Sequence, residues 1–185
     1  FNGSVCTVIS SSPTSITCTL GPNFVGSYPV TVQVAGNGYA RPVSMALQFK
    51  YTLTATSVAP SNGSFAGMNT LTVYGVGFNP TSTVVTICGR LCGMASDPPQ
   101  LTMLSCIVPS YTSTLPQPGA VACNVTVTSQ NSTVVLPNAY TYNGSLTPVV
   151  FSVNRTRGGT AGGSVLLISG TGLTGVANVT IAGVV

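Results

Sequence analysis

The sequence is almost devoid of charge. Only 3% of its 185 residues are charged, namely five basic residues and one acidic residue, and it contains no histidine, glutamate or tryptophan. An average soluble protein carries roughly 25% charged residues. Disordered chains combine low hydrophobicity with high net charge, whereas 44% of this chain is apolar and its mean hydropathy is +0.49. The composition therefore favours a folded protein whose surface is polar mainly through serine, threonine and asparagine.

These absences exclude most catalytic and metal-binding chemistry. A nucleophile needs a base, and general acid–base catalysis needs a histidine or a carboxylate within reach. The single acidic residue, Asp97, lies beside two prolines. Calcium sites need several oxygen ligands with charge among them. We therefore expect no enzyme activity, no catalytic residue, no metal site and no cofactor.

Three other kinds of site are also disfavoured. The glycine-rich stretch 158–163 follows Arg155 and Arg157, but it lacks the strand–loop–helix context and the Gly-Lys-Ser/Thr ending of a phosphate-binding loop, so we interpret it as a turn. The five basic residues are spread along the chain, and no nucleic-acid partner is expected. No apolar run reaches the roughly 18 residues of a membrane-spanning helix, so no membrane span is expected.

One strand pattern recurs along the chain. Residues 71–78 alternate apolar and polar side chains and then pass through two glycines, and residues 165–173 repeat this pattern with Gly170 in the place of Gly75, 95 positions later. Alternation with a period of two is typical of a half-buried β-strand. Other landmarks recur at offsets between 86 and 95 positions. Strands of fixed length joined by loops of variable length produce such offsets.

The repeat divides the chain into three parts. We expect an N-terminal segment (residues 1–52) that is the back half of one β module, a central segment (residues 53–143) that is a complete module, and a C-terminal segment (residues 144–185) that is the front half of a third. We also expect the chain to be part of a longer protein. No glycine- or serine-rich linker separates the first two segments, which favours a restricted angle between them.

Alternation also predicts the core and the turns. A strand is expected at residues 30–34, followed by a hairpin turn at residues 36–38, and a further turn is expected at residues 60–63. The residues expected in the core of the central segment are Leu71, Val73, Val85, Ile87, Val125, Val127 and Tyr142.

The order of landmarks in the central segment resembles a known domain family. A Pro-x-x-Gly opening at residues 60–63 precedes the Gly-x-Gly-Phe strand, a Val-x-Ile-x-Gly strand, two spaced cysteines with a proline after the second, a Val-Thr-Val strand and a closing Tyr-x-Tyr. This resembles the IPT/TIG domain of plexins, of growth-factor receptors of the Met type and, in tandem, of fibrocystin-like proteins. The resemblance implies an all-β fold of tandem immunoglobulin-like β-sandwich modules. It implies no catalytic residues.

The repeat also predicts disulfide pairs. Two cysteines of the N-terminal segment correspond to two of the central segment, so the pairs Cys6–Cys18 and Cys92–Cys106 are expected in successive modules. Cys88 and Cys123 both lack a cysteine counterpart in the N-terminal segment. Because the two members of a bonded pair are expected to be absent together, we expect a third pair, Cys88–Cys123.

The third pair has a geometric difficulty. Cys88 is out of phase with Ile87 in its strand, whereas Cys123 is in phase with Val125, so the strand ends must bend for the bond to close. Free buried cysteines or a metal site are the alternative interpretation, although the spacing is not that of a zinc site. Disulfides require an oxidising compartment, so we expect an extracellular or cell-surface location reached through the secretory pathway.

Seven Asn-x-Ser/Thr triplets agree with that location. Composition alone predicts roughly three, so the excess is modest. Asn62 and Asn143 precede glycine in expected turns and are the foremost candidates for N-linked glycans, whereas Asn124 and Asn178 fall in expected strands and should be poorer acceptors. The full set of candidates is Asn62, Asn143, Asn131, Asn154, Asn2, Asn124 and Asn178.

Two classes of function remain. The first is a non-enzymatic structural segment of a long glycoprotein, acting as a spacer or as an assembly subunit of a matrix or surface-appendage filament. Its partners would be neighbouring modules, other protein chains and N-linked glycans. The second is an adhesion or receptor ectodomain that binds a protein or glycan ligand. Scarce charge favours the first, because uncharged surfaces lack the repulsion that keeps proteins apart.

Overall fold

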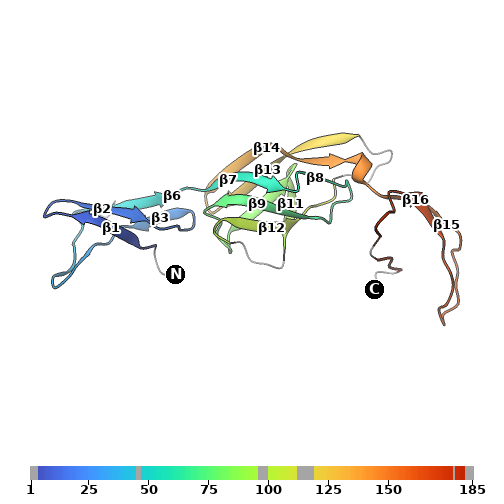
Figure 1. Ribbon diagram of the computed structural model, residues 1–185, viewed down its shortest axis with the longest axis horizontal. Helices are drawn as coiled ribbons and strands as arrows, with labels where there is room; N and C mark the ends of the chain where they lie inside the picture. Colours follow the sequence, from blue (N-terminus) through green and yellow to red (C-terminus); the bar gives the residue numbers. More distant parts are fainter. Residues whose placement is uncertain (1–3, 45–46, 96–99, 112–118, 177, 182–185) are drawn as a thin grey trace.

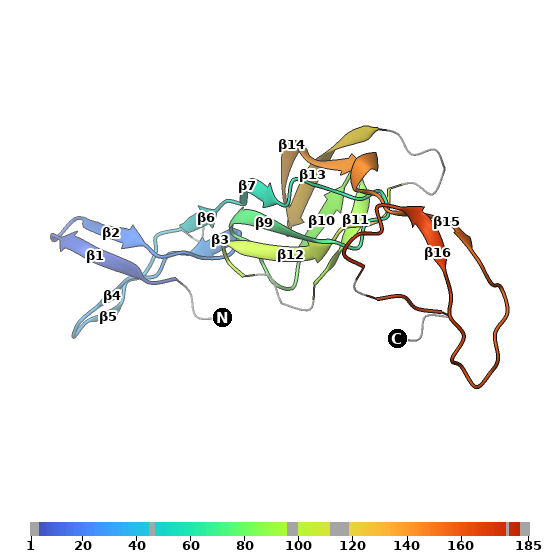
Figure 2. The same cartoon turned by 45° about the vertical axis from the view of Figure 1, so that its right-hand side comes forward.

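The protein is built almost entirely from β-strands. The computed structural model describes residues 4–44, 47–95, 100–111, 119–176 and 178–181. Figures 1 and 2 show an elongated molecule in which a sandwich occupies the middle, with smaller groups of strands at either end. Among the described residues, the structure has no helix that is both long and apolar enough to cross a membrane.

The central segment forms a sandwich of eight hydrogen-bonded strands. In sheet order these are β7 (Thr54–Ala59), β9 (Thr70–Val76), β12 (Met103–Ile107), β11 (Arg90–Met94), β10 (Thr83–Ile87), β13 (Ala120–Ser129), β14 (Ser132–Asn143) and β8 (Asn62–Gly63). All neighbours are antiparallel except β8 and β14. Figure 2 shows β9 and β12 in one layer and β10, β13 and β14 in the other. The fold class is therefore all-β and sandwich-like, as predicted.

The core lies between these layers. Successive side chains of a strand point to opposite faces, so every second residue enters the core. All seven residues predicted for the core are 0% exposed, which confirms that prediction. They are joined by further buried side chains, among them Phe65, Phe78, Leu104, Val108 and Tyr140.

The C-terminal segment repeats the first strand pair of the sandwich. Its strands β15 (Val149–Val153) and β16 (Ile168–Thr171) pair as β7 and β9 do. Gly170 lies opposite Val150 as Gly75 lies opposite Ala55, and both ladders shift register just beyond this point. A Cβ atom at Gly75 would collide with the Thr54 carbonyl, and one at Gly170 would collide with the Val149 carbonyl. Close backbone approach therefore explains the repeated glycine.

The N-terminal segment consists of two-stranded sheets. β1 (Cys6–Ser11) pairs with β2 (Ile16–Leu20), β3 (Gly26–Pro29) with β6 (Gln48–Tyr51), and β4 (Gln33–Val34) with β5 (Gly38–Tyr39). The hairpin predicted at residues 36–38 is confirmed, since it joins β4 to β5.

Two sequence predictions were partly wrong. The strand expected at residues 30–34 is interrupted, since β3 ends at Pro29 and β4 begins only at Gln33, although the Val30 N–H still donates to the Leu47 carbonyl at 3.1 Å. Of the turn expected at residues 60–63, Asn62 and Gly63 instead form β8, which pairs in parallel with Thr141 and Tyr142 of β14. Pairing with a strand nearly 80 positions away overrides the local turn signal there.

Candidate disulfide and glycosylation sites

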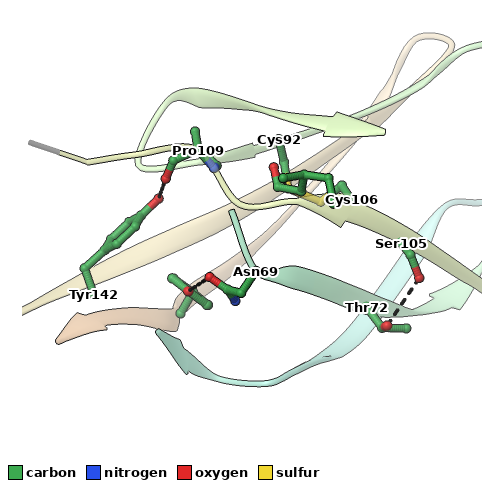
Figure 3. The surroundings of a disulfide bond; sticks show 9 residues. Asn69, Thr72, Cys92, Ser105, Cys106, Pro109 and Tyr142 are labelled. Atoms are coloured by element: carbon green, nitrogen blue, oxygen red, sulfur yellow. Dashed lines mark hydrogen bonds between the residues drawn. A yellow bond between two sulfur atoms is a disulfide. The ribbon is translucent and has the colours of Figure 1, made fainter. Parts of the chain in front are cut away.

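The structure pairs all six cysteines, in the three combinations that the repeat predicts. The Cα–Cα distances are 5.5 Å for Cys6–Cys18, 4.9 Å for Cys88–Cys123 and 5.5 Å for Cys92–Cys106. All three fall in the usual range for a disulfide. Cys92 and Cys106 join the neighbouring strands β11 and β12 inside the core (Figure 3). Cys6 and Cys18 join β1 and β2 in the same way but are half-buried.

Two local bends remove the phase problem of the third disulfide. Cys88 does not continue β10, because it lies with Gly89 in a two-residue turn to β11 and has a φ of +49°. On the other side, the ladder of β13 and β14 shifts register between Cys123 and Val125. The Cys88 N–H donates to the Asn124 carbonyl at 3.1 Å, which holds the two bends together. The cysteine that alternation places on the wrong face thereby reaches its partner.

A buried tyrosine next to the Cys92–Cys106 disulfide ties the last strand to a loop. The Tyr142 hydroxyl donates to the Pro109 carbonyl at 2.7 Å (Figure 3), and its ring lies 5.1 Å from that of Tyr140. Burial is the largest cause that raises the pKa of Tyr142 to about 12, and the neighbouring Tyr140 is the next largest. Burial also raises the pKa of Tyr140, against the effect of its hydrogen bond to Asn69.

The same tyrosine contact occurs in the N-terminal segment. The Tyr51 hydroxyl donates to the Gly21 carbonyl at 2.9 Å, and the ring centroids of Phe49 and Tyr51 are 5.0 Å apart. Tyr51 and Tyr142 are 91 positions apart and Gly21 and Pro109 are 88 apart, which are the offsets of the closing Tyr-x-Tyr and of Cys18 and Cys106. Sequence analysis missed this contact, although the two offsets together point to it.

The predicted glycosylation sites differ in exposure. Asn62, Asn124, Asn131, Asn154 and Asn178 are exposed, Asn143 is half-buried, and Asn2 lies outside the described residues. Asn131 lies in the two-residue turn between β13 and β14. Asn178 does not lie in a strand, contrary to expectation, and Asn124 does lie in one but at its register shift. Exposure of the side chain therefore gives no ground for ranking these two below the others, and occupancy of every site stays a prediction.

Asn62 and Asn143 lie at one edge of the sandwich. Asn62 pairs with Thr141, two residues before Asn143 on the neighbouring strand β14. The Asn143 side-chain oxygen accepts hydrogen bonds from the backbone N–H and the hydroxyl of Ser145, at 3.0 and 2.8 Å. The side-chain nitrogen, which is the atom that carries an N-linked glycan, takes no part in these bonds.

The structure describes only some of the residues considered for ligand binding. In the described part of the chain, no three His, Cys, Asp or Glu residues are grouped so that they could hold a metal ion. Asp97 lies outside the described residues. Arg155, Arg157 and residues 158–163 are all exposed and belong to the connection between β15 and β16. Arg155, Arg157 and Gly158 line an open pocket of about 390 Å³ there, together with Val153 and Ile181.

Comparison with known proteins agrees with these features. Residues 1–51 and 53–142 match the family model of the IPT/TIG domain. The chain is 33% identical over 171 residues to fibrocystin-L of Homo sapiens and 34% identical over 172 residues to fibrocystin-L of Mus musculus. These matches cover 92% and 91% of this chain but only 4% of each relative.

Similarity to solved structures is weaker, as one example shows. The extracellular region of plexin A4 matches 82% of this chain with 13% of its own, at 19% identity and a TM-score of 0.45.

Proposed function

Because the chain belongs to the IPT/TIG domain family, we propose that it is a non-enzymatic structural segment of a long extracellular or cell-surface glycoprotein. Residues 1–52, 53–143 and 144–185 are the back half, the whole and the front half of three successive immunoglobulin-like modules. In this proposal the segment acts as a spacer or as an assembly subunit of a matrix or surface-appendage filament.

Repetition of structural contacts is the observation that carries this proposal. The tyrosine–carbonyl bond and the disulfide between adjacent strands occur in both the N-terminal and the central segments. The glycine opposite a backbone carbonyl occurs in both the central and the C-terminal segments. A protein that repeats its stabilising contacts rather than a ligand-binding group is suited to setting distance and shape. The three disulfides support a location in an oxidising compartment.

The character of the surface supports contact with other chains or with glycans. Outward-facing residues of neighbouring strands pair through hydroxyl groups instead of charges, as in Thr128 with Thr133 at 3.1 Å and Thr72 with Ser105 at 3.3 Å. An edge strand without charged side chains offers free N–H and carbonyl groups to a further strand. At the β8 edge we propose glycans on Asn62 or Asn143, which would cover β14 there.

Measuring whether the chain associates tests the proposal. The 185-residue chain is produced with and without N-linked glycosylation, and its mass is measured by sedimentation over a range of concentrations. The unglycosylated chain is expected to associate, and the variants Asn62→Gln and Asn143→Gln should shift the glycosylated chain toward that behaviour. Asn37→Gln is the matched control, because Asn37 is an exposed asparagine outside any triplet. A chain that stays monomeric without glycan would contradict the assembly role and the proposed glycan cover, and would leave only the spacer role.

One observation favours the alternative of an adhesion or receptor ectodomain that binds a protein or glycan ligand. Tyr74 and Met103 lie opposite each other on β9 and β12 and are 43% and 37% exposed. Tyrosine and methionine are enriched in protein interfaces. A monomeric chain that bound a ligand and lost it on Tyr74→Ser would support this alternative.

A further inference from the structure

The two joints between segments differ in length. Tyr51 is separated from Leu53 by Thr52 alone. In the second joint, five residues (143–147) separate Tyr142 from Pro148. Pro148 is the counterpart of Leu53, since Leu53 lies beside Gly77 and Pro148 lies beside Gly172, the matching glycine 95 positions later.

A side chain of the N-terminal segment is buried at the first joint. Val25 is 1% exposed and belongs to the same buried apolar cluster as Leu53 and Phe78 of the central segment. It is the one buried position among the described residues of the N-terminal segment. The Val25 N–H also donates to the Gly77 carbonyl at 3.0 Å, so a backbone hydrogen bond crosses the joint.

Two glycines allow the segments to approach this closely. Gly77 is buried and has a φ of +90°, and a Cβ atom there would lie 3.2 Å from the Thr52 carbonyl oxygen and 3.4 Å from the Val25 nitrogen. Gly26 has a φ of +149°, and a Cβ atom there would lie 3.3 Å from the side-chain oxygen of Gln130, in the turn between β13 and β14. The N-terminal and central segments therefore approach each other closely at two places, at Gly77 and at Gly26.

The second joint is built differently. Ala120 is the counterpart of Val25, and it is exposed and paired with Asn143. Three of the five joint residues form the short 3-10 helix η1 (Gly144–Leu146), and the joint ends at Thr147, whose hydroxyl accepts a hydrogen bond from the Phe65 N–H at 2.9 Å. From Pro148 onward, none of the described residues is buried.

We infer that the two joints differ in stiffness. Val25 and Gly77 hold the N-terminal and central segments together as one rigid body, whereas the chain bends just after Thr147, whose hydroxyl still accepts the hydrogen bond from Phe65 of the central segment. This inference goes beyond the proposed function, because it states where the chain bends and applies equally to a spacer and to a receptor.

Residual dipolar couplings of the backbone N–H bonds in the 185-residue chain test the inference. Couplings from the N-terminal and central segments are expected to fit one alignment tensor. Couplings from the C-terminal segment should need a second tensor of smaller magnitude. Different tensors for the first two segments would overturn the rigid first joint, and one tensor for all three segments would overturn the hinge. This comparison needs no substitution and so does not depend on the stability of any variant.

Substitutions then test which residues hold the first joint rigid. Val25→Ala should separate the first two tensors and speed hydrogen exchange of the residue-25 amide by about tenfold or more, since a weakened joint opens more often. Val30→Ala is the matched control, because Val30 belongs to the same segment and is 53% exposed. Gly77→Ala, on the central-segment side of the joint, should likewise separate the first two tensors and speed exchange of the residue-25 amide. Protection of the β3 and β6 amides reports whether the N-terminal segment itself stays folded. A single tensor in both joint variants would contradict the assignment to Val25 and Gly77.

Discussion

The strand pairs β7–β9 and β15–β16 have the same register but very different burial. Both ladders place a glycine against a backbone carbonyl and shift register beyond it. In β9, Leu71 is 0% exposed, whereas its counterpart in the C-terminal segment, Leu166, is half-buried. The pairing of two strands therefore depends on local sequence, but burial depends on the opposite layer, which only the central segment supplies among the described residues.

The N-terminal and central segments make a complementary comparison. Tyr51 and Tyr142 donate the same hydrogen bond, and the disulfides Cys6–Cys18 and Cys92–Cys106 have the same Cα–Cα distance of 5.5 Å. Tyr142 is 0% exposed while Tyr51 is half-buried. The same contact should therefore contribute more in the central segment, where water is excluded.

Truncation of a core leucine should have the largest effect on this comparison. Leu71→Ala is expected to lower the free energy of unfolding of the central segment by about 3 kcal/mol, since it removes a buried side chain and leaves a cavity. The matched variant Leu166→Ala, just before β16, should change the stability of the mostly exposed pair β15–β16 by less than about 1 kcal/mol. Hydrogen exchange of the β13 and β16 amides measures each effect separately. Equal losses at the two sites would show that the C-terminal strands are as well covered as β9.

Removal of a disulfide should have an effect of similar size. Cys92 and Cys106 close a loop with a sequence separation of 14, and such a crosslink stabilises a fold by about 3 kcal/mol. The double variant Cys92→Ser, Cys106→Ser is therefore expected to lower the urea midpoint of the central segment.

Cys6→Ser with Cys18→Ser is the control for that experiment. It should loosen β1 and β2 and leave the exchange of β13 amides unchanged, because that disulfide lies within the N-terminal segment. If both double variants destabilised β13 equally, the two segments would unfold as one unit.

Alkaline pH should destabilise the central segment next most strongly. The pKa of Tyr142 is raised from 10.0 to about 12, so the folded state holds the phenolic proton more tightly than the unfolded state does. This contribution is fully present below pH 10 and is lost as the pH rises toward 12, by about 2 kcal/mol. Urea unfolding followed by circular dichroism between pH 9 and pH 12 measures it. Tyr142→Phe should flatten this profile, and an unchanged profile in that variant would assign the loss to other groups.

Loss of one tyrosine hydroxyl should have the smallest effect. Tyr142→Phe is expected to cost about 1 kcal/mol at neutral pH, since it removes the hydrogen bond to the Pro109 carbonyl. Tyr51→Phe removes the equivalent bond in a half-buried place and should cost less. Hydrogen exchange of the β13 and β3 amides compares the two. A larger loss at Tyr51 would contradict the dependence on burial.

Much of the fold could be predicted from the sequence because the relevant signals are local or repeated. Alternation with a period of two places Leu71, Val73 and the other strand residues in the core wherever the strand lies. The repeat reveals the disulfide partners without knowledge of distance, since partners recur or disappear together. The exposed position of Asn131 was not predicted, because the turn between β13 and β14 carries no glycine or proline signal.

By itself, the sequence determined the strand periodicity, the three cysteine pairs and the near absence of charged groups. Only the tertiary structure decided which residues from distant positions meet. Val25 is buried because Gly77, 52 positions later, leaves room for it, and Asn62 joins a strand because β14 offers a free edge. Likewise, Cys88 reaches Cys123 because a turn and a register shift bend both strands. Each of these contacts depends on how separate elements pack, and no local pattern contains that information.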